Sequence, residues 1–224
     1  MSSLLEIDSV IKSFGGREIL TDIYLRCETG DVIGILGRNG TGKSTLLKIL
    51  FGTQSAERKF IRIDGQVLDK SYTSPDQICY LPQHNFLLHH LTVEKTIKTF
   101  LNKKNCDVFL DDSLLFPLRG HKVSQLSGGE MRYLEVKLLL HTENKFVLLD
   151  EPFNEISPVT IDLIKEMIRK ASANKGIILT DHDYRNVLDV ANKYLLLYDG
   201  GIKRISDKEE LVRWNYISKH KAES

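Results

Sequence analysis

The first eighty residues carry the hydrophobic pattern of β-strands. Apolar side chains alternate loosely with polar ones or gather in short runs, and glycine turns such as Gly15-Gly16 and Asp64-Gly65 separate the segments. Turns this tight indicate antiparallel neighbours in the N-terminal part. The strands predicted here are residues 4–11, 18–28, 31–36, 59–64 and 77–81.

The pattern changes in the second half of the chain, where helical spacing alternates with short apolar runs. Helices are predicted over residues 92–101, 130–140 and 160–171, and strands over residues 146–149 and 176–180. Strands and helices that alternate in this way indicate βαβ units and a parallel sheet. Residues 194–205 predict a hairpin that turns at Asp199-Gly200-Gly201. The fold class is therefore expected to be α/β, with a mixed or parallel sheet and an antiparallel N-terminal β-subdomain.

Composition narrows the class of protein. The hydrophobic share of 42% and the charged share of 27% are those of a globular protein, and we expect a single domain over residues 1–224. The 31 basic and 30 acidic residues argue against a protein whose main role is electrostatic binding of nucleic acid. Three widely spaced cysteines without a CxxC pair indicate reduced thiols in a cytosolic protein. No apolar run reaches the roughly 18 residues of a membrane span, and the N-terminus lacks the pattern of a secretory signal.

A glycine-rich segment follows the predicted strand 31–36 and precedes a helical pattern. It fits G-x-x-x-x-G-K-[ST] in the context that a phosphate loop requires. Its glycines let backbone N–H groups point at phosphate oxygens, and the helix that follows adds its positive end. Lys43 supplies a mobile charge for the β- and γ-phosphates, and Ser44 offers a hydroxyl ligand for Mg²⁺. The predicted nucleotide-binding residues of this P-loop NTPase core are Gly37, Arg38, Asn39, Gly40, Thr41, Gly42, Lys43, Ser44 and Thr45.

The predicted strand 146–149 leads directly into two acidic residues. Functional side chains gather at the C-terminal ends of strands in open α/β sheets. Asp150 is predicted to hold Mg²⁺, and Glu151 to act as the base that activates the attacking water. The alternative is a solvated strand end at the start of a turn.

A second candidate phosphate site precedes the predicted helix 130–140. Ser127 and Glu130 have the spacing of a capping box, which alone would explain their presence. It does not explain Gly128 and Gly129, since glycines weaken a helix unless something must approach its backbone. The exposed N-terminus of this helix could bind an anion.

Taken together, GRNGTGKST, LSGGE and FVLLDE resemble the motifs of an ATP-binding cassette (ABC) ATPase, in that family's order and spacing and over nearly the whole chain. The resemblance implies a short helical subdomain over residues 83–126 and a head-to-tail homo- or heterodimer. In such a dimer each ATP lies between the phosphate loop of one subunit and the signature residues of the other. The signature residues here are Ser127, Gly128, Gly129 and Glu130.

The same resemblance assigns three further residues. Phe14 matches the aromatic residue that stacks on adenine, although a core aromatic residue is the alternative. Gln83 matches the glutamine that contacts Mg²⁺ and the attacking water, and His182 matches the histidine that contacts the γ-phosphate. The predicted catalytic set is thus Lys43, Gln83, Glu151 and His182, and the predicted Mg²⁺ ligands are Ser44, Gln83 and Asp150.

The chain also departs from the family pattern. Ser157 stands where an aspartate that couples the two ATP sites is expected, and Tyr133 stands where an arginine is common, with Arg132 one place earlier. The span between Gln83 and Leu126 is shorter than usual, and this part of the family docks on membrane partners. None of these changes removes a predicted phosphate, magnesium or water ligand.

The leading functional hypothesis is the ATP-hydrolysing subunit of an ABC transporter, cytoplasmic and attached to the membrane through an integral-membrane partner. The alternatives are a soluble ABC ATPase, as in iron–sulfur assembly or nucleic-acid and ribosome work, and a regulatory cassette that does not hydrolyse ATP. The apolar residues 86–88 with Leu91 are predicted either to face the membrane partner or to pack inside the helical subdomain. The tail 208–224 is predicted to be a solvated helix end or to touch lipid headgroups.

Overall fold

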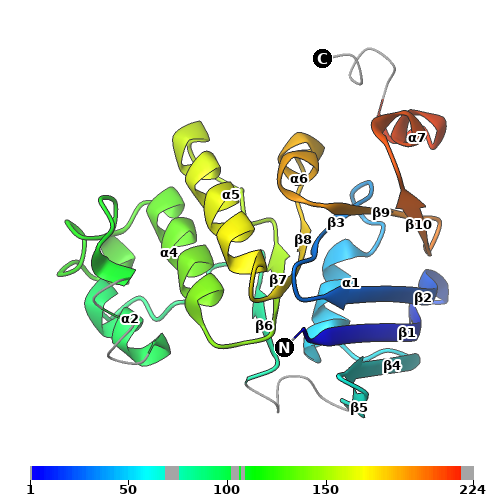
Figure 1. The fold of residues 1–224 in the computed structure, drawn as a ribbon, viewed down its shortest axis with the longest axis horizontal. Helices are drawn as coiled ribbons and strands as arrows, with labels where there is room; N and C mark the ends of the chain where they lie inside the picture. Colours follow the sequence, from blue (N-terminus) through cyan, green and yellow to red (C-terminus); the bar gives the residue numbers. More distant parts are fainter. Residues whose placement is uncertain (1, 69–75, 102–105, 107–108, 218–224) are drawn as a thin grey trace.

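The computed structural model describes residues 2–68, 76–101, 106 and 109–217 of the chain. Its strands form a four-stranded sheet in the order β2-β1-β4-β5 and a six-stranded sheet in the order β10-β9-β3-β8-β7-β6 (Figure 1). The first sheet contains β1 (Leu4–Phe14), β2 (Arg17–Glu28), β4 (Arg58–Ile63) and β5 (Gln66–Val67). The second contains β3 (Val32–Leu36), β6 (Ile78–Leu81), β7 (Phe146–Asp150), β8 (Gly176–Thr180), β9 (Lys193–Tyr198) and β10 (Gly201–Ile205).

The predicted fold class is confirmed. Every neighbouring pair in the four-stranded sheet is antiparallel, and Phe14 pairs with Arg17 across the tight turn. β1 therefore extends three residues beyond its predicted end at residue 11. In the six-stranded sheet, β3, β6, β7, β8 and β9 run parallel, and only β10 is antiparallel, as the second arm of the predicted hairpin.

Six α-helices and one 3₁₀-helix lie wholly within the described residues. They are α1 (Lys43–Phe51), α2 (Val93–Phe100), η2 (Val123–Gln125), α4 (Gly128–His141), α5 (Pro158–Ser172), α6 (Tyr184–Val190) and α7 (Lys208–Arg213). α4 begins two residues earlier than predicted because Gly128 and Gly129 form its first turn behind the Ser127 cap. α6 was not predicted, since seven residues span too little sequence for a clear helical period.

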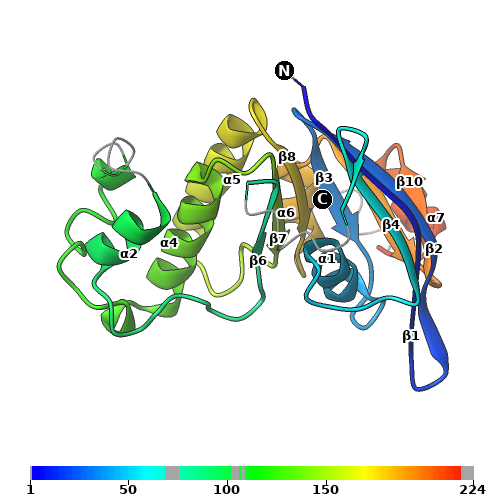
Figure 2. The same cartoon turned by 90° about the horizontal axis from the view of Figure 1, so that it is seen from below.

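Two hydrophobic cores lie on opposite faces of the six-stranded sheet. Helix α1 lies between this sheet and the antiparallel sheet, and its apolar side chains join those of both in one core (Figures 1 and 2). Helices α4, α5 and α6 cover the other face, and that core continues into the helical region around α2. Alternate residues of β7 enter the two cores: Phe146 and Leu148 enter one, and Val147 and Leu149 the other. Both faces of the strand are buried, so its carboxyl end is held firmly.

A buried polar cluster attaches residues 109–112 to helix α4. Lys137 Nζ donates to Asp112 Oδ2 at 2.6 Å and to the Phe109 carbonyl at 2.8 Å. The Tyr133 hydroxyl donates to the same Asp112 oxygen at 2.7 Å. The Lys137 and Asp112 side chains are 8% and 9% exposed, so this ion pair is almost fully desolvated.

Replacing Asp112 by Asn should lower the free energy of unfolding by about 3 kcal/mol at pH 7, because the buried Lys137 ammonium loses its counter-charge. Burial alone would raise the pKa of Asp112, but hydrogen bonds from Lys137 and Tyr133 outweigh it and hold the pKa below its ordinary value. A depressed carboxyl pKa stabilises the fold above the unfolded pKa, which is about 3.9. That contribution is lost as the pH falls through the folded pKa.

Urea unfolding from pH 7 down to pH 3 measures this effect. The difference in unfolding free energy between wild type and Asp112→Asn should be constant above about pH 5 and should shrink below about pH 4. Asp162→Asn, at an exposed position of α5, is the matched control and should change stability little. A difference that persisted unchanged at pH 3 would contradict the ion-pair explanation.

Candidate active site

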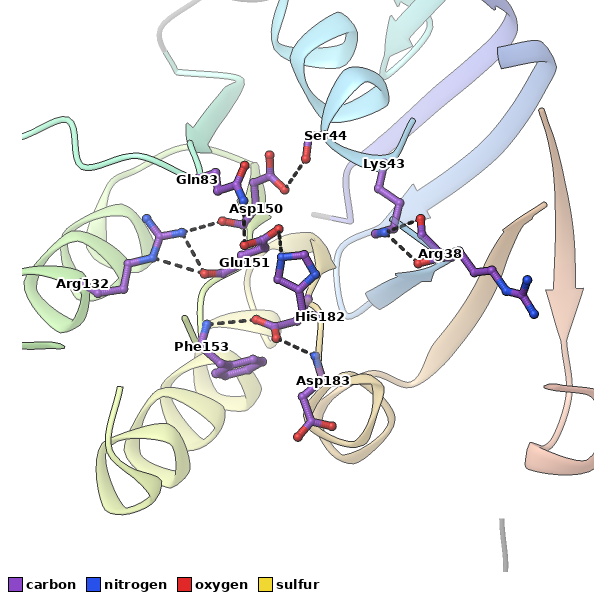
Figure 3. Close-up of polar contacts among 12 residues, drawn as sticks. Arg38, Lys43, Ser44, Gln83, Arg132, Asp150, Glu151, Phe153, His182 and Asp183 are labelled. Atoms are coloured by element: carbon purple, nitrogen blue, oxygen red, sulfur yellow. Dashed lines mark hydrogen bonds and ion pairs between the residues drawn. The ribbon is translucent and has the colours of Figure 1, made fainter. Parts of the chain in front are cut away.

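The glycine-rich segment lies between the end of β3 and the first turn of α1. Gly42, just before the helix, has a φ of 104°, which glycine adopts without a steric penalty. A Cβ at this position would lie 2.7 Å from Ile19 Cγ2, so a larger residue would also collide. Lys43 Nζ donates to the carbonyl of Gly37 at 2.7 Å and to that of Arg38 at 3.1 Å (Figure 3). The loop therefore curls around the ammonium group.

Asp150 ends β7 and points its buried carboxylate toward α1. Ser44 Oγ donates to Asp150 Oδ1 at 2.9 Å, and the Tyr80 hydroxyl donates to Oδ2 at 3.0 Å. Burial raises the pKa of Asp150, and these two hydrogen bonds oppose the shift. Burial likewise lowers the pKa of Lys43, and the carboxylates of Glu151 and Asp150 oppose that shift. The lysine and the aspartate thus favour each other's charged forms.

Glu151 follows immediately, and its carboxylate is 7% exposed. Its Oε1 lies 2.7 Å from His182 Nε2, and its Oε2 accepts a hydrogen bond from Gln83 Nε2 at 2.9 Å (Figure 3). The backbone φ of Glu151 is 56°, a left-handed conformation that costs a residue other than glycine about 1–3 kcal/mol and is common at active sites. Three segments, which follow β6, β7 and β8, therefore meet at one carboxylate.

Phe14 is the last residue of β1. The residue is 48% exposed, and Lys12 Nζ lies 4.9 Å from the centroid of its ring. The alternative of a core aromatic residue is therefore wrong. Contact with adenine stays a prediction.

Three residues of this cluster were not assigned to it from the sequence: Tyr80, Arg132 and Asp181. The buried Asp181 carboxylate accepts hydrogen bonds from the backbone N–H groups of Phe153 and Asp183, and so joins the segments after β7 and β8. Arg132 donates to the two backbone carbonyls at the end of β7 (Figure 3). Tyr80 and Asp181 could have been found from their positions near the carboxyl ends of parallel strands. A buried arginine in a helix gives no such signal.

The ABC transporter family model matches residues 20–154, which is more than half of the chain. This chain belongs to the ABC transporter family. The match begins in β2 and includes the phosphate loop, the signature and the end of β7. The chain is therefore an ATP-binding subunit of the ABC type, as the resemblance of its motifs implies.

Curated relatives and solved structures agree with this assignment. The lipopolysaccharide export system ATP-binding protein LptB of Acidithiobacillus ferridurans is 30% identical, over 95% of this chain and 93% of the relative. The sulfate/thiosulfate import ATP-binding protein CysA of Bacillus cereus is 28% identical, over 92% of this chain and 62% of the relative. A structure described as an ATP-binding subunit of an ABC transporter has a TM-score of 0.83 at 22% identity, covering 96% of this chain and 95% of that one, and supports the fold.

The signature segment of this ABC ATPase forms the start of α4. The predicted capping box is confirmed: Ser127 N–H donates to Glu130 Oε2 at 2.8 Å, and Glu130 N–H donates to Ser127 Oγ at 3.3 Å. A Cβ on Gly128 or Gly129 would lie 3.1–3.2 Å from oxygen atoms of Glu155. The glycine pair therefore allows the segment around Glu155 to lie close to the start of α4. Contact of these glycines with the ATP of a partner subunit stays a prediction.

The departures from the family pattern have local structural roles. Ser157 caps α5, since its Oγ accepts from the Thr160 N–H at 3.3 Å. Tyr133 belongs to the buried cluster around Asp112, where it takes part in holding the helical region. An effect of Ser157 on communication between ATP sites stays a prediction.

The apolar segment after Gln83 has one buried and one exposed part. Leu87 is 5% exposed and belongs to the core, and Phe86 packs edge-on against Phe100. Leu88 is 56% exposed and is free to meet a partner. Packing inside the helical region is therefore confirmed for Phe86 and Leu87, and contact of this segment with a membrane partner stays a prediction.

The C-terminal segment packs back onto the domain. Trp214 packs against Tyr198 and Tyr216 against Tyr184, so this part of the tail is no freely solvated helix end. Of the cations in this tail, Arg213 ends α7, and Lys219, His220 and Lys221 lie outside the described residues. Within the described part of the chain, no helix combines the length and apolarity needed to cross a bilayer.

Proposed function

We propose that this ABC ATPase hydrolyses Mg²⁺-ATP and thereby powers transport by an integral-membrane partner at the cytoplasmic face of the membrane. The observation that carries the proposal is the convergence of Glu151 with Gln83 and His182 beside the phosphate loop. Such a cluster has both a base and polar groups that can orient a water molecule. LptB and CysA are named for export of lipopolysaccharide and import of sulfate or thiosulfate, so we propose membrane transport without a particular substrate.

Each residue has a proposed role in the reaction. Lys43 leaves the carbonyls of Gly37 and Arg38 and binds the β- and γ-phosphates, whose negative charge attracts the ammonium more strongly than a carbonyl does. The Glu151 carboxylate accepts a proton from the attacking water, and Gln83 holds that water in line. His182 donates a hydrogen bond to the γ-phosphate from its ring.

The donor set suits Mg²⁺. The Ser44 hydroxyl and the Asp150 carboxylate lie within hydrogen-bond distance of each other, and both are hard oxygen ligands. The Gln83 side chain offers a further oxygen. No group of three or more His, Cys, Asp or Glu side chains that could hold a metal is found among the described residues. Mg²⁺ beside a nucleotide is commonly held by one or two carboxylates and completes its shell with phosphate and water, and Asp150 would supply the carboxylate here. When bound, the ion neutralises charge that develops on the phosphates.

Head-to-tail dimerisation is part of the proposal. Ser127 and the two glycines stand at the N-terminus of a fourteen-residue helix, whose positive end favours a phosphate group. In a dimer this helix end would face the γ-phosphate that the other subunit holds.

Recovery of partners from the host tests the transport proposal. Tagged Glu151→Gln protein is crosslinked in cells with ATP and Mg²⁺, and the proteins recovered from membrane and soluble fractions are identified by mass spectrometry. We expect a polytopic membrane protein in fixed ratio to the tagged chain. Leu88→Glu, a change at an exposed apolar position after Gln83, should reduce that recovery while ATP binding persists. Recovery of soluble proteins alone would contradict transport and favour the soluble ATPase.

A further inference from the structure

Arg132 is a buried arginine whose guanidinium N–H donors all make hydrogen bonds. It is 3% exposed, and it makes five hydrogen bonds, which matches its five N–H donors. Nη1 donates to the Pro82 carbonyl at 2.8 Å, and Nη2 donates to the Glu151 carbonyl at 2.9 Å and also to the Asp150 carbonyl. The side chain extends from α4 to the backbone of the two acidic residues (Figure 3).

Glu135, one turn further along α4, completes the arrangement. It is 0% exposed, and its Oε2 lies 3.3 Å from Arg132 Nη1. Its Oε1 accepts the backbone N–H of Phe86 at 2.8 Å. Together, Arg132 and Glu135 bond the backbone on both sides of Gln83, at Pro82 and at Phe86.

The backbone of Glu151 needs such support. Its φ of 56° is unfavourable for a residue with a side chain, and a conformation of this kind persists only where the surroundings hold it. The Glu151 carbonyl accepts from two nitrogens of Arg132, Nε and Nη2, and the Glu151 N–H donates to the Thr180 carbonyl at 2.8 Å. The peptide group on each side of Glu151 is thus fixed by another segment.

We propose that Arg132 and Glu135 are positioning residues for ATP hydrolysis, which hold Glu151 and Gln83 at the distance that lets both act on one water molecule. The inference rests on the hydrolysis proposed above, and it adds two residues that touch neither nucleotide nor water. A lysine at position 132 could not replace the arginine, because one ammonium nitrogen cannot reach three carbonyls in different directions as the planar fork does.

The signature helix gains a second role from this arrangement. α4 begins with Ser127 and the glycine pair, and the next two turns carry Arg132 and Glu135. The end of the helix proposed to meet the partner's ATP is therefore connected by a rigid element to the water-activating residues of its own subunit.

The test compares Arg132→Met and Glu135→Gln with wild type. Arg132→Met should lower kcat for phosphate release by about 10- to 100-fold, since displacement of a catalytic group by about 1 Å has effects of that size. KM for ATP should change by less than about threefold, because no nucleotide contact is lost. Glu135→Gln keeps the shape and an acceptor for Phe86 N–H, so it should fold and reduce kcat by a smaller factor.

A readout that requires no turnover accompanies the kinetics. In Arg132→Met, amide hydrogen exchange should accelerate in residues 82–88 and 150–154. In Glu135→Gln it should accelerate by a smaller factor and in residues 82–88 alone, because a neutral amide oxygen is a weaker acceptor for the Phe86 N–H than a carboxylate. Lys165→Met is the matched control. Lys165 is a buried cation of α5 that pairs with Asp189. Among the described residues it makes no hydrogen bond or ion pair to either segment. It should leave kcat and both exchange patterns as in wild type.

The outcomes separate the two proposals. A wild-type kcat in Arg132→Met, with unchanged exchange in both segments, would overturn the positioning role while hydrolysis stands. A parallel rise in KM and fall in stability, shared by Lys165→Met, would also overturn it and leave a purely structural arginine. Wild-type protein that binds ATP but releases no phosphate would refute the proposed hydrolysis, and the exchange data would still show whether Arg132 fixes the two segments.

Discussion

Glu151→Gln protein is expected to release phosphate about 10²- to 10⁴-fold more slowly than wild type, which is the range for loss of a general base. The amide keeps the size of the carboxylate but offers one acceptor oxygen and one NH2 donor. The contact with His182 can persist at the oxygen, and Gln83 can turn its own amide oxygen toward the new NH2 group. ATP binding, which depends on the phosphate loop, should change by less than about threefold. Single-turnover phosphate release and equilibrium binding of ATP measure the two effects separately.

A closed dimer should accumulate as a consequence. If ATP joins two subunits and hydrolysis separates them, the variant with ATP and Mg²⁺ should sediment as a dimer, whereas wild type returns to monomer as ATP is consumed. Glu166→Gln makes the same chemical change at an exposed position of α5 and should behave as wild type in both assays. Phosphate release by Glu151→Gln at the wild-type rate would show that another group activates the water.

The hydrophobic pattern of the sequence predicts those strands and helices whose apolar positions match the faces that are buried in the fold. β7 is a continuous apolar run because both of its faces are covered, and its carboxyl end delivers Asp150 where the strand-end rule expects it. The same rule places Gln83, Glu151 and His182 together, because β6, β7 and β8 are parallel neighbours. Helix α6 escapes prediction because its seven residues form a helix largely through tertiary packing.

The contacts that hold the catalytic residues in place could not be predicted in the same way. Arg132 interacts with residues that lie 18, 19 and 50 positions away in the sequence, and nothing local distinguishes it from a surface arginine. The left-handed backbone of Glu151 is equally hidden, since a glutamate in that conformation breaks the local preference. Tertiary contacts overrule local preference at both residues, as is expected where function needs a strained backbone.

Lys43→Ala tests ATP binding, the step before hydrolysis, and we expect this variant to lose most of its affinity for ATP. The ammonium group would make at least two charge-assisted contacts with the β- and γ-phosphates, each worth about 1.5–3 kcal/mol. A loss of about 3 kcal/mol weakens binding by at least about 100-fold. The helix itself should be preserved, since alanine has the highest helix propensity and Lys43 is the first residue of α1.

Isothermal titration of ATP, ADP and AMP into wild type and Lys43→Ala isolates the phosphate contribution. The loss should be largest for ATP, smaller for ADP and absent for AMP, because the lysine reaches only the outer phosphates. Lys48→Ala, an exposed lysine in the last turn of the same helix, removes an equal charge and should leave the order of affinities intact. Equal losses for all three nucleotides would mean that Lys43 shapes the loop through the Gly37 and Arg38 carbonyls instead of binding phosphate.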